Sequence, residues 1–202
     1  MSLGPSAPTV RPGRPVEISP TGGWSGPVEY GVSIALGNWI AGYLGGDLSV
    51  PVHDLGCGTG FYAARLRNAG FTRVTGYEYD VPTVALFAPI RAQDLTEPFT
   101  VAEPGHVLFL EVGEHIPAEY QETVLDNAVR AIAPGCKLIA SWAELDQPGE
   151  GHVNCLPNET VIAAFEARGL LCMLGPTDAV RRLEHAPCGH FSRTSMVLMR
   201  PK

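Results

Sequence analysis

Three glycines at alternate positions mark the segment VHDLGCGTGFYAARL, which covers residues 52–66. An apolar run precedes Gly56, Gly58 and Gly60, and a stretch with helical spacing follows them. A tight turn needs one or two glycines, so the third calls for another reason. Gly56 would allow the sharp exit from a strand, Gly58 would let a ligand approach the main chain, and Gly60 would admit a helix close to the sheet. Taken alone, the three glycines could also form an ordinary glycine-rich turn. Together with the acidic residues described below, they predict a nucleotide-binding turn.

The spacing of these glycines separates two kinds of nucleotide cofactor. A dinucleotide fingerprint runs G-x-G-x-x-G, whereas here the order is G-x-G-x-G and Phe61 stands where the last glycine would be. The spacing therefore disfavours a dinucleotide and favours S-adenosylmethionine.

Two acidic residues stand at the ends of later apolar runs. Glu78 ends the run VTGYEYD, 18 residues beyond Gly60, where an acid can accept hydrogen bonds from ribose hydroxyls. Asp94 follows the next run, in RAQDLTEPF, and could receive an adenine amino group beside apolar Leu95. Either acid alone would more often be a solvated surface charge, but two at strand ends support the nucleotide interpretation.

The surrounding sequence alternates short β-rich runs with helical ones, which predicts an α/β fold with a mostly parallel sheet covered on both faces. The β-rich runs are Val50–Leu55, Arg73–Tyr79, Ala88–Gln93, His106–Leu110, Cys136–Trp142, Leu170–Leu174 and Ser195–Arg200. The helical patterns are a first one from Pro27 to a stop at Gly45 and Gly46, then Tyr62–Ala69, Ala118–Ile132 and Asn158–Arg168. The interval between Tyr79 and Ala88 is too short for a full crossover helix and predicts an abbreviated turn.

Length and composition bound the class of protein. At 202 residues with 45% hydrophobic residues, the chain fits one domain with a sizeable core. Residues 1–27 are rich in proline and glycine and predict a tail or strap, which leaves residues 28–202 as the folded domain. The net charge of −7 argues against a nucleic-acid partner. The sequence also shows neither a membrane-spanning stretch nor a secretory signal, so we expect a cytoplasmic enzyme, a monomer or homodimer, with a small-molecule substrate.

The cysteines give no sign of a disulfide framework or a metal site. The five cysteines are scattered, and none are spaced as C-x-x-C. We therefore expect reduced, mostly buried thiols and no bound metal.

At this point the chain resembles the class I S-adenosylmethionine-dependent methyltransferases, with HDLGCGTG, GYEYD, AQDL and FLEVGEHIP in the family's order. The resemblance covers about residues 48–145, and the final run TSMVLMR fits the family's antiparallel hairpin. It implies a doubly wound, Rossmann-like sheet of seven strands in the order 3-2-1-4-5-7-6, with the last strand antiparallel. It also implies a cofactor site in four parts. The residues are Asp54, Gly56, Gly58 and Gly60 for the methionine part, Glu78 for the ribose, Asp94 and Leu95 for the adenine, and Glu111 and Val112 for the sulfonium.

Methyl transfer requires chiefly that the acceptor be aligned and, for oxygen or nitrogen acceptors, that a proton be removed. His115 follows the fourth strand and His152 the fifth, so either could be the base. Alternatively, each histidine only orients its loop by a hydrogen bond to the backbone. Glu114, beside His115, is more simply explained as a negative charge at the start of a helix.

Further residues could contact the acceptor or close the site. Trp142, Asn154 and His190 are candidates for acceptor binding, although Trp142 would more often be core packing and a turn also explains His190. Trp24 and Tyr30 could close over the cofactor as a lid.

Three functions remain open on the sequence. The first is an S-adenosylmethionine-dependent methyltransferase that acts on an oxygen or nitrogen of a small molecule, in secondary metabolism, with S-adenosylhomocysteine as product. The second is an NAD(P)-dependent oxidoreductase on a related sheet, and the third is a non-catalytic module that binds the cofactor. A basic protein or peptide acceptor also stays open, given the acidic balance of the chain.

Overall fold

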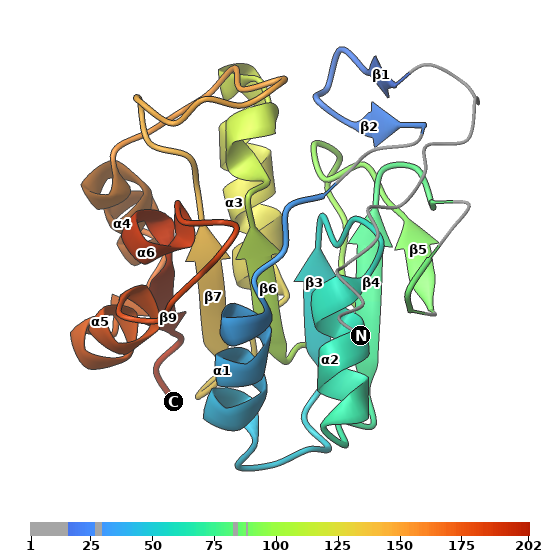
Figure 1. Ribbon diagram of the computed structural model, residues 1–202. Coiled ribbons are helices and arrows are strands. Elements are labelled where there is room, and N and C mark those ends of the chain that lie inside the picture. The colour runs from blue at the N-terminus through green and yellow to red at the C-terminus, as the bar shows by residue number, and fades with distance from the viewer. Residues whose placement is uncertain (1–15, 27–29, 83–84, 88) are drawn as a thin grey trace, which may run out of the picture.

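A computed structural model describes residues 16–26, 30–82, 85–87 and 89–202. Within these residues one large sheet runs through the molecule (Figure 1). Its strands are β3 (Val52–Leu55), β4 (Val74–Glu78), β5 (Ile90–Ala92), β6 (His106–Leu110), β7 (Lys137–Ser141), β8 (Leu171–Cys172) and β9 (Met196–Met199). Their spatial order is β5-β4-β3-β6-β7-β9-β8, and β9 is the strand that runs antiparallel to the rest of the sheet. The predicted fold class and strand order are confirmed.

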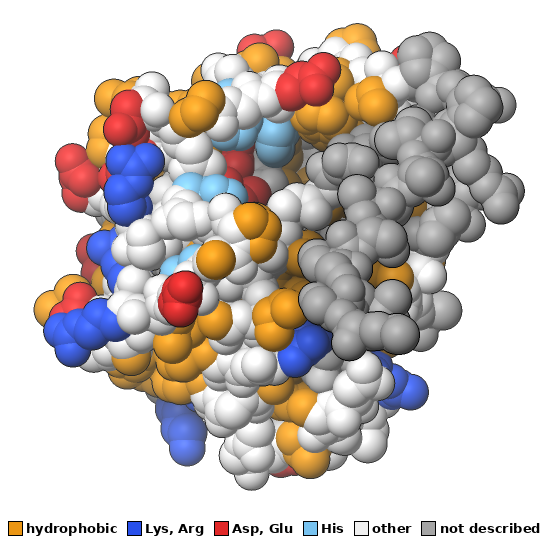
Figure 2. All heavy atoms as spheres, viewed as in Figure 1, with side chains coloured by type: hydrophobic (Ala, Val, Ile, Leu, Met, Phe, Trp, Pro, Cys, Tyr) orange, Lys and Arg blue, Asp and Glu red, His pale blue; other side chains and the backbone are white. Residues whose placement is uncertain are grey.

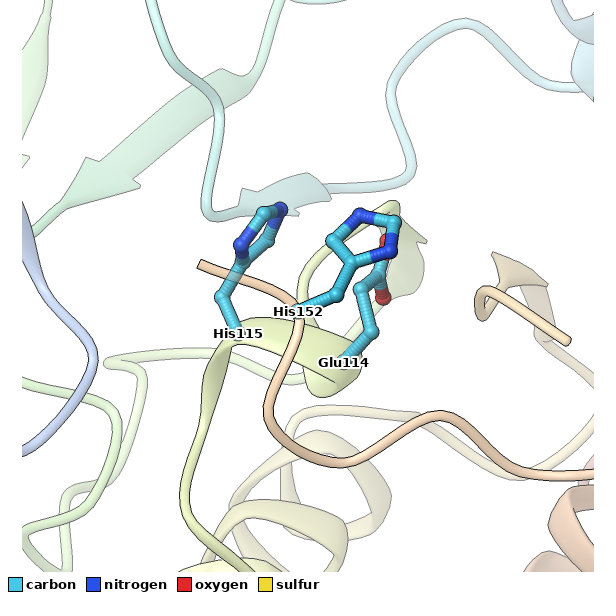
Figure 3. Close-up of side chains that lie close together, drawn as sticks. All are labelled: Glu114, His115 and His152. Carbon is cyan, nitrogen blue, oxygen red and sulfur yellow. The ribbon is translucent and has the colours of Figure 1, made fainter. Parts of the chain in front are cut away.

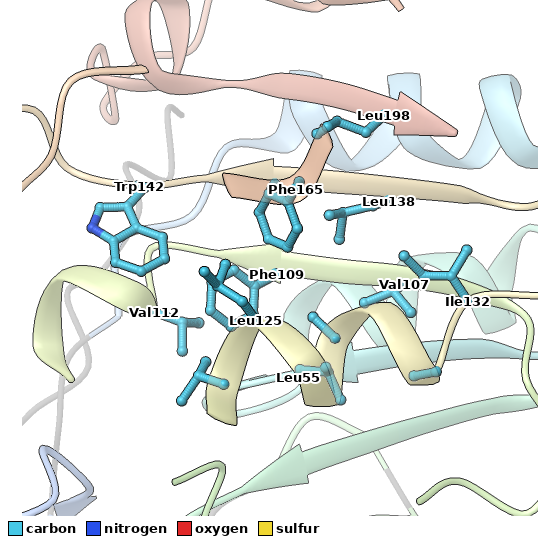
Figure 4. Packing of buried hydrophobic residues seen from close by; sticks show 14 of the residues in the cluster. Leu55, Val107, Phe109, Val112, Leu125, Ile132, Leu138, Trp142, Phe165 and Leu198 are labelled. Atoms are coloured by element: carbon cyan, nitrogen blue, oxygen red, sulfur yellow. The ribbon is translucent and has the colours of Figure 1, made fainter. Parts of the chain in front are cut away.

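Helices cover both faces of this sheet. They are α1 (Ile34–Leu44), α2 (Phe61–Asn68), α3 (Gln121–Arg130), α4 (Asn158–Glu166), α5 (Leu174–Arg181) and α6 (Phe191–Thr194), with 3-10 turns η1 (Gly113–His115) and η2 (Ala118–Tyr120). Side chains of a strand point alternately to the two faces, and β6 follows this rule. Phe109 packs with Leu125 of α3 and Phe165 of α4 (Figure 4), whereas Leu108 packs in the other core with α1 and α2. Because β6 is buried on both faces, its position is fixed from both sides.

The first helix begins later than predicted. Ser33 is its N-cap, since the Ser33 hydroxyl accepts a hydrogen bond from the Leu36 N–H at 3.1 Å. The Ser33 N–H in turn donates to the Tyr62 hydroxyl, which anchors the cap to α2. The predicted start at Pro27 lies outside the described residues, and residues 30–32 are not helical. A polar cap with a tertiary partner therefore outweighs the apolar spacing that extended the predicted helix.

Two helices near the C-terminus were not predicted. The first turn of α5 contains Gly175 and Pro176, which resemble a loop in sequence, although proline is tolerated in the first turn of a helix. Helix α6 has only four residues, too few for a periodic signal.

The segment predicted as a tail contains a small hairpin among its described residues. Strands β1 (Glu17–Ile18) and β2 (Trp24–Ser25) pair antiparallel, and we call residues 17–25 the N-terminal hairpin. Its turn is held by hydrogen bonds from Ser19 N–H to Gly23 O at 2.8 Å and from Gly23 N–H to the Ser19 hydroxyl at 2.9 Å. The boundary between residues 27 and 28 stays a prediction.

Three smaller expectations can be compared with the structure. Residues 79–82 and 85–87 form no helix, in line with the predicted short turn; residues 83, 84 and 88 lie outside the description. All five cysteines are free, and three of them are buried. No helix among the described residues combines the length and apolarity needed to cross a membrane.

Because Phe109 is completely buried in the core shared with α3 and α4, Phe109→Ala should lower the free energy of unfolding by about 3–5 kcal/mol. Leu174, whose side chain is 73% exposed, is the control: Leu174→Ala should change stability by less than about 0.5 kcal/mol. Denaturant unfolding monitored by tryptophan fluorescence measures both. Equal effects of the two substitutions would contradict the described core.

Candidate functional site

A cavity of about 480 Å³ lies at the carboxyl ends of the parallel strands. Its walls come from the segments that follow β3, β4, β5, β6 and β7, together with the N-terminal hairpin and the segment before α1. In open α/β sheets this edge is the usual place for a ligand, because the connections diverge there. Figure 2 shows a hollow on the face turned to the viewer, with histidine and acidic side chains inside it.

The glycine turn forms one wall of the cavity. Gly56, Gly58 and Gly60 all have positive φ angles, of 72°, 54° and 81°, which L side chains rarely adopt. A Cβ at Gly56 would lie 2.5 Å from the Val112 side chain, and one at Gly58 would lie 2.9 Å from the Tyr30 ring. Gly56 and Gly58 border the cavity, whereas Gly60 starts α2 and does not. The turn thus offers bare backbone to the cavity at two of the three glycines.

Glu78 joins the end of β4 to this turn. Its Oε2 accepts a hydrogen bond from the Gly58 N–H at 2.6 Å, and its Oε1 accepts one from the Tyr79 N–H at 3.0 Å. The side chain borders the cavity but is only 8% exposed, and burial raises the pKa of its carboxyl. Each carboxylate oxygen can accept a further hydrogen bond, so Glu78 can still receive the hydroxyl groups of a sugar.

Asp54, at the end of β3, is an almost completely buried acid in the cavity wall. It is 2% exposed, and its Oδ2 has no hydrogen-bond partner among the described residues. Burial, assisted by the nearby Glu78, raises the pKa of Asp54 to about 7. A cationic group in the cavity would compensate this buried carboxylate.

Asp94 and Leu95 lie at the end of the cavity nearest β5. Asp94 Oδ1 accepts hydrogen bonds from the Thr96 N–H and hydroxyl, at 2.9 and 2.7 Å. Its Oδ2 accepts one from the Thr21 hydroxyl, at 3.0 Å, so the N-terminal hairpin reaches across the cavity to it. Leu95 is buried and adds an apolar surface.

Glu111 and Val112 follow β6 and border the cavity beside the glycine turn. Glu111 has a φ of 54°, which costs a non-glycine residue about 1–2 kcal/mol, and its N–H donates to the Ser141 hydroxyl at 2.9 Å. Its Oε2 accepts a hydrogen bond from Gln147 Nε2 at 2.5 Å and lies 3.5 Å from His190 Nε2. The strained backbone thus carries a carboxylate that Gln147 holds by a hydrogen bond and that His190 faces.

His115 and His152 come together although 37 positions separate them in the sequence. Their rings meet edge to face, with centroids 5.0 Å apart, and both border the cavity. His115 Nδ1 lies 3.3 Å from Gly151 O, and His152 Nδ1 lies 3.1 Å from Gln147 O. Burial and the neighbouring His152 lower the pKa of His115 to about 4, which keeps its ring neutral.

Glu114 lies beside these two rings and is completely buried, at 0% exposure (Figure 3). Glu114 does lie in the first turn of a helical segment, the 3-10 turn η1, as the helix-start interpretation states. Its carboxyl is buried, however, which that interpretation alone does not explain. Neither carboxylate oxygen has a hydrogen-bond partner among the described residues. Burial, and the nearby Glu111, raise the pKa of Glu114 well above its usual value.

Two of the residues considered for acceptor binding lie outside the cavity wall. Trp142 is part of the core, and its indole N–H donates to the Asn154 carbonyl at 2.6 Å. Asn154 is buried, and its side-chain N–H donates to Gln121 Oε1 at 3.1 Å. His190 does border the cavity.

Two residues that contact the predicted site residues, Thr21 and Gln147, were not themselves candidates on the sequence. Thr21 and Gln147 contact Asp94 and Glu111 directly, as described above. The turn sequence SPTGG before Trp24 was a signal for the hairpin, but its partner across the cavity could not be read from the sequence. Trp24 and Tyr30, considered as lid residues, both border the cavity, and the Trp24 ring packs edge to face on His115 at 5.3 Å.

Comparison with known protein families gives a match over part of the chain. Residues 53–140 match the family described as a methyltransferase domain. No curated protein matches the sequence.

Solved structures share the fold. A sugar N-methyltransferase from Streptoalloteichus has a TM-score of 0.63 at 14% identity, with 84% of this chain and 88% of that chain covered. The 1,6-didemethyltoxoflavin-N1-methyltransferase from Burkholderia thailandensis, solved with 1,6-didemethyltoxoflavin and S-adenosylhomocysteine, has a TM-score of 0.62 at 16% identity, covering 84% and 80%. The magnesium protoporphyrin IX methyltransferase from Synechocystis, solved with S-adenosylhomocysteine, has a TM-score of 0.55 at 18% identity, covering 80% of each chain. At these identities the likeness establishes the fold.

Asp54 predicts a pH dependence of stability in the unliganded protein. Its pKa rises from 3.8 to about 7 on folding, so between these values the folded state holds a proton that the unfolded state has lost. Stability therefore falls as pH rises through this window, by roughly 4 kcal/mol at most from this group. Asp54→Asn removes the contribution, and the variant should gain stability relative to wild type between pH 5 and 8. Denaturant unfolding across this range measures the difference. Asp178 is exposed, so the stability of Asp178→Asn should change with pH as that of wild type does. The same pH dependence in Asp54→Asn would contradict a raised pKa of Asp54.

Proposed function

We propose that this chain, whose residues 53–140 match a methyltransferase-domain family, is a class I S-adenosylmethionine-dependent methyltransferase that transfers the methyl group to an oxygen or nitrogen of a small molecule. One observation carries the proposal. The wall of one cavity contains a glycine-rich turn bonded to Glu78, two imidazoles that touch each other, and the Glu111 carboxylate. Such a cavity has a nucleotide end, and an end where an acceptor can meet side chains.

The residues of the nucleotide end fit this cofactor. S-adenosylmethionine, when bound, supplies a methyl group attached to a sulfonium. The leaving group is S-adenosylhomocysteine, in which this sulfur is an uncharged thioether. The buried, unpartnered Asp54 oxygen suits the amino group of the methionine part, and Gly56 and Gly58 leave room for that part against the main chain. Glu78 would hold the ribose.

The remaining cofactor contacts follow from the same placement. Asp94 and Leu95 would receive the adenine, a role that requires sharing Asp94 with Thr21. Glu111 and Val112 would lie against the sulfonium. Gly60 would act indirectly, by starting α2 close to the sheet.

The acceptor end contains the residues proposed for catalysis. His152 and His115 border the cavity, and each has one ring nitrogen beside a backbone carbonyl, which leaves the other for the acceptor. We propose that they contact the acceptor's reacting atom and take up its proton. His190 would help to bind the acceptor through its place beside Glu111. For Trp142 and Asn154 a supporting role remains, because the bond between them holds the loop that carries His152.

A small-molecule acceptor fits the dimensions and charge of the site. The cavity of about 480 Å³ must hold cofactor and acceptor together, which favours a compact acceptor. The net charge of −7 opposes nucleic acid. Two structural neighbours are named for a sugar and for didemethyltoxoflavin, which supports a role in secondary metabolism. Five free cysteines support the cytoplasm as the setting, and we expect a monomer or homodimer.

The alternative functions predict other results. An NAD(P)-dependent oxidoreductase would bind a dinucleotide, which the glycine spacing and the methyltransferase domain disfavour. A non-catalytic module would bind S-adenosylmethionine without releasing S-adenosylhomocysteine in the presence of any acceptor. Screening small molecules and basic peptides for this release separates these cases.

Binding of S-adenosylhomocysteine tests the nucleotide end. Gly58→Val places a branched side chain at a φ of 54° against the Tyr30 ring and into the cavity. Glu78→Gln keeps the shape but removes the charge that accepts the Gly58 N–H. Each should weaken binding at least about tenfold, or about 1.4 kcal/mol, in calorimetry. The exposed Glu119→Gln is the matched control and should bind like wild type. Undiminished binding by Gly58→Val would refute the proposed site.

Turnover tests the acceptor end. With an acceptor found by the screen, His152→Ala and His115→Ala should each reduce kcat at least about 100-fold, the scale of lost proton transfer. Their affinity for S-adenosylhomocysteine should stay within about threefold of wild type, since neither ring belongs to the nucleotide end. Steady-state kinetics and calorimetry on the same preparations measure both quantities. Retained kcat in both variants would remove the histidines from the proposed mechanism.

A further inference from the structure

A buried carboxyl group without a partner marks the acceptor end of the cavity. Glu114 is completely buried, and neither of its oxygens has a hydrogen-bond partner among the described residues. An uncompensated buried carboxylate is costly, so acids at such positions are generally paired or coordinate a metal. No Lys or Arg side chain forms an ion pair with Glu114 in the described part of the chain. The structure thus leaves Glu114 in need of a cation or a proton.

Two imidazoles complete a cluster around this carboxyl. Glu114, His115 and His152 each offer one ligand atom, and these atoms lie within 4.8 Å of one another. Figure 3 shows the two rings and the carboxyl side by side. In a tetrahedral site with bonds of about 2.0–2.2 Å, ligand atoms lie about 3.4 Å apart, so small side-chain rotations would close the cluster on an ion.

The outer contacts of both histidines match those of metal ligands. A ligating histidine usually donates its other ring N–H to a carbonyl or carboxylate, which fixes the tautomer and the ring. His115 Nδ1 lies 3.3 Å from Gly151 O and His152 Nδ1 lies 3.1 Å from Gln147 O. With these protons on Nδ1, the Nε2 lone pair of each ring is left for a ligand.

We propose that Glu114, His115 and His152 bind one first-row divalent transition metal ion at the acceptor end of the cavity. Two neutral imidazoles and one carboxylate suit zinc and its neighbours, whereas magnesium and calcium prefer oxygen ligands. Three protein ligands leave at least one coordination position for another molecule. Because His115 and His152 border the cavity, this position is available to an acceptor oxygen or nitrogen.

The metal site goes beyond the proposed function and alters one part of it. A ring nitrogen that holds an ion cannot also take up a proton, so the ion would replace the proposed base. Cysteine spacing carries no signal for this site, because none of its proposed ligands is a cysteine. The proposed ligands are instead two adjacent residues and a third from a distant loop.

Zinc binding tests the proposal without any acceptor or cofactor. The untagged full chain, stripped with a chelator, is titrated with Zn²⁺ alone in competition with a chromophoric chelator. We expect one ion per chain and a rise in Tm on loading, because the ion binds the folded state. Mg²⁺ should give neither. His152→Ala and Glu114→Gln should each weaken Zn²⁺ binding at least about 100-fold, beyond the usual effect of an outer contact.

Controls separate this site from other ligands and from unfolding. His190→Ala keeps the cluster but removes another cavity histidine, and Cys155→Ser removes the thiol that lies 3.7 Å from His152 Nδ1. Both should bind Zn²⁺ like wild type. Glu114→Gln is nearly isosteric, and its metal-free Tm shows whether it folds. Failure of the wild type to bind Zn²⁺, or wild-type affinity for Zn²⁺ in either His152→Ala or Glu114→Gln, would overturn the site. Such a failure leaves methyl transfer untouched, because S-adenosylhomocysteine binding and turnover are measured separately.

Discussion

A hydrogen bond from the Gly58 N–H to the Glu78 carboxylate ties the first turn of the sheet to the end of the neighbouring strand. The bond depends on left-handed backbone at Gly56 and Gly58, which turns the main chain toward β4. Parallel pairing brings Leu55 opposite Tyr77, so the turn after β3 and the acid that ends β4 meet at one edge. The cavity opens beside this bond, and on its other side β6 brings Glu111 to the same edge.

From this edge the cavity is built by two different means. The nucleotide end uses backbone and short acids that are anchored in or next to strands, which gives it a rigid shape. The acceptor end uses side chains on the loops after β6 and β7, and their positions depend on one another: Gln147 holds Glu111, and Gly151 contacts the His115 ring. The shape of one end therefore follows from the sheet and its turns, whereas the shape of the other depends on the residues of two loops.

Local patterns predicted those parts of the structure that depend on local physics. Apolar runs located the central strands β3, β4, β6, β7 and β9 because these strands are mostly buried. The spacing of Gly56 and Gly58 located the turn because glycine suits its positive φ angles. The resemblance to a known family supplied the strand order, which no spacing could give. Helix ends were less predictable, since Ser33 became the cap through a bond to Tyr62 that lies far away in the sequence.

The acceptor end could be predicted only in part, because its contacts are made between distant segments. The sequence singled out His115 and His152 but could not show that their rings touch, or that Glu114 lies buried beside them. It likewise proposed Trp142 for the acceptor, whereas the indole N–H is used by the Asn154 carbonyl inside the core. The hydrogen-bond partner of an indole N–H can be predicted only when the position of the loop that contacts it is known.

The N-terminal hairpin touches both ends of the cavity from a single short turn. The Thr21 hydroxyl donates a hydrogen bond to Asp94, and Trp24, three residues later, packs on the His115 ring. Hydrogen bonds within the hairpin close its turn. Gly22 approaches the His115 carbonyl so closely that any Cβ there would collide with it. The hairpin thus covers two parts of the cavity at once. If it moves as one unit away from Asp94, Trp24 also leaves the His115 ring, so the two parts of the cavity are uncovered together.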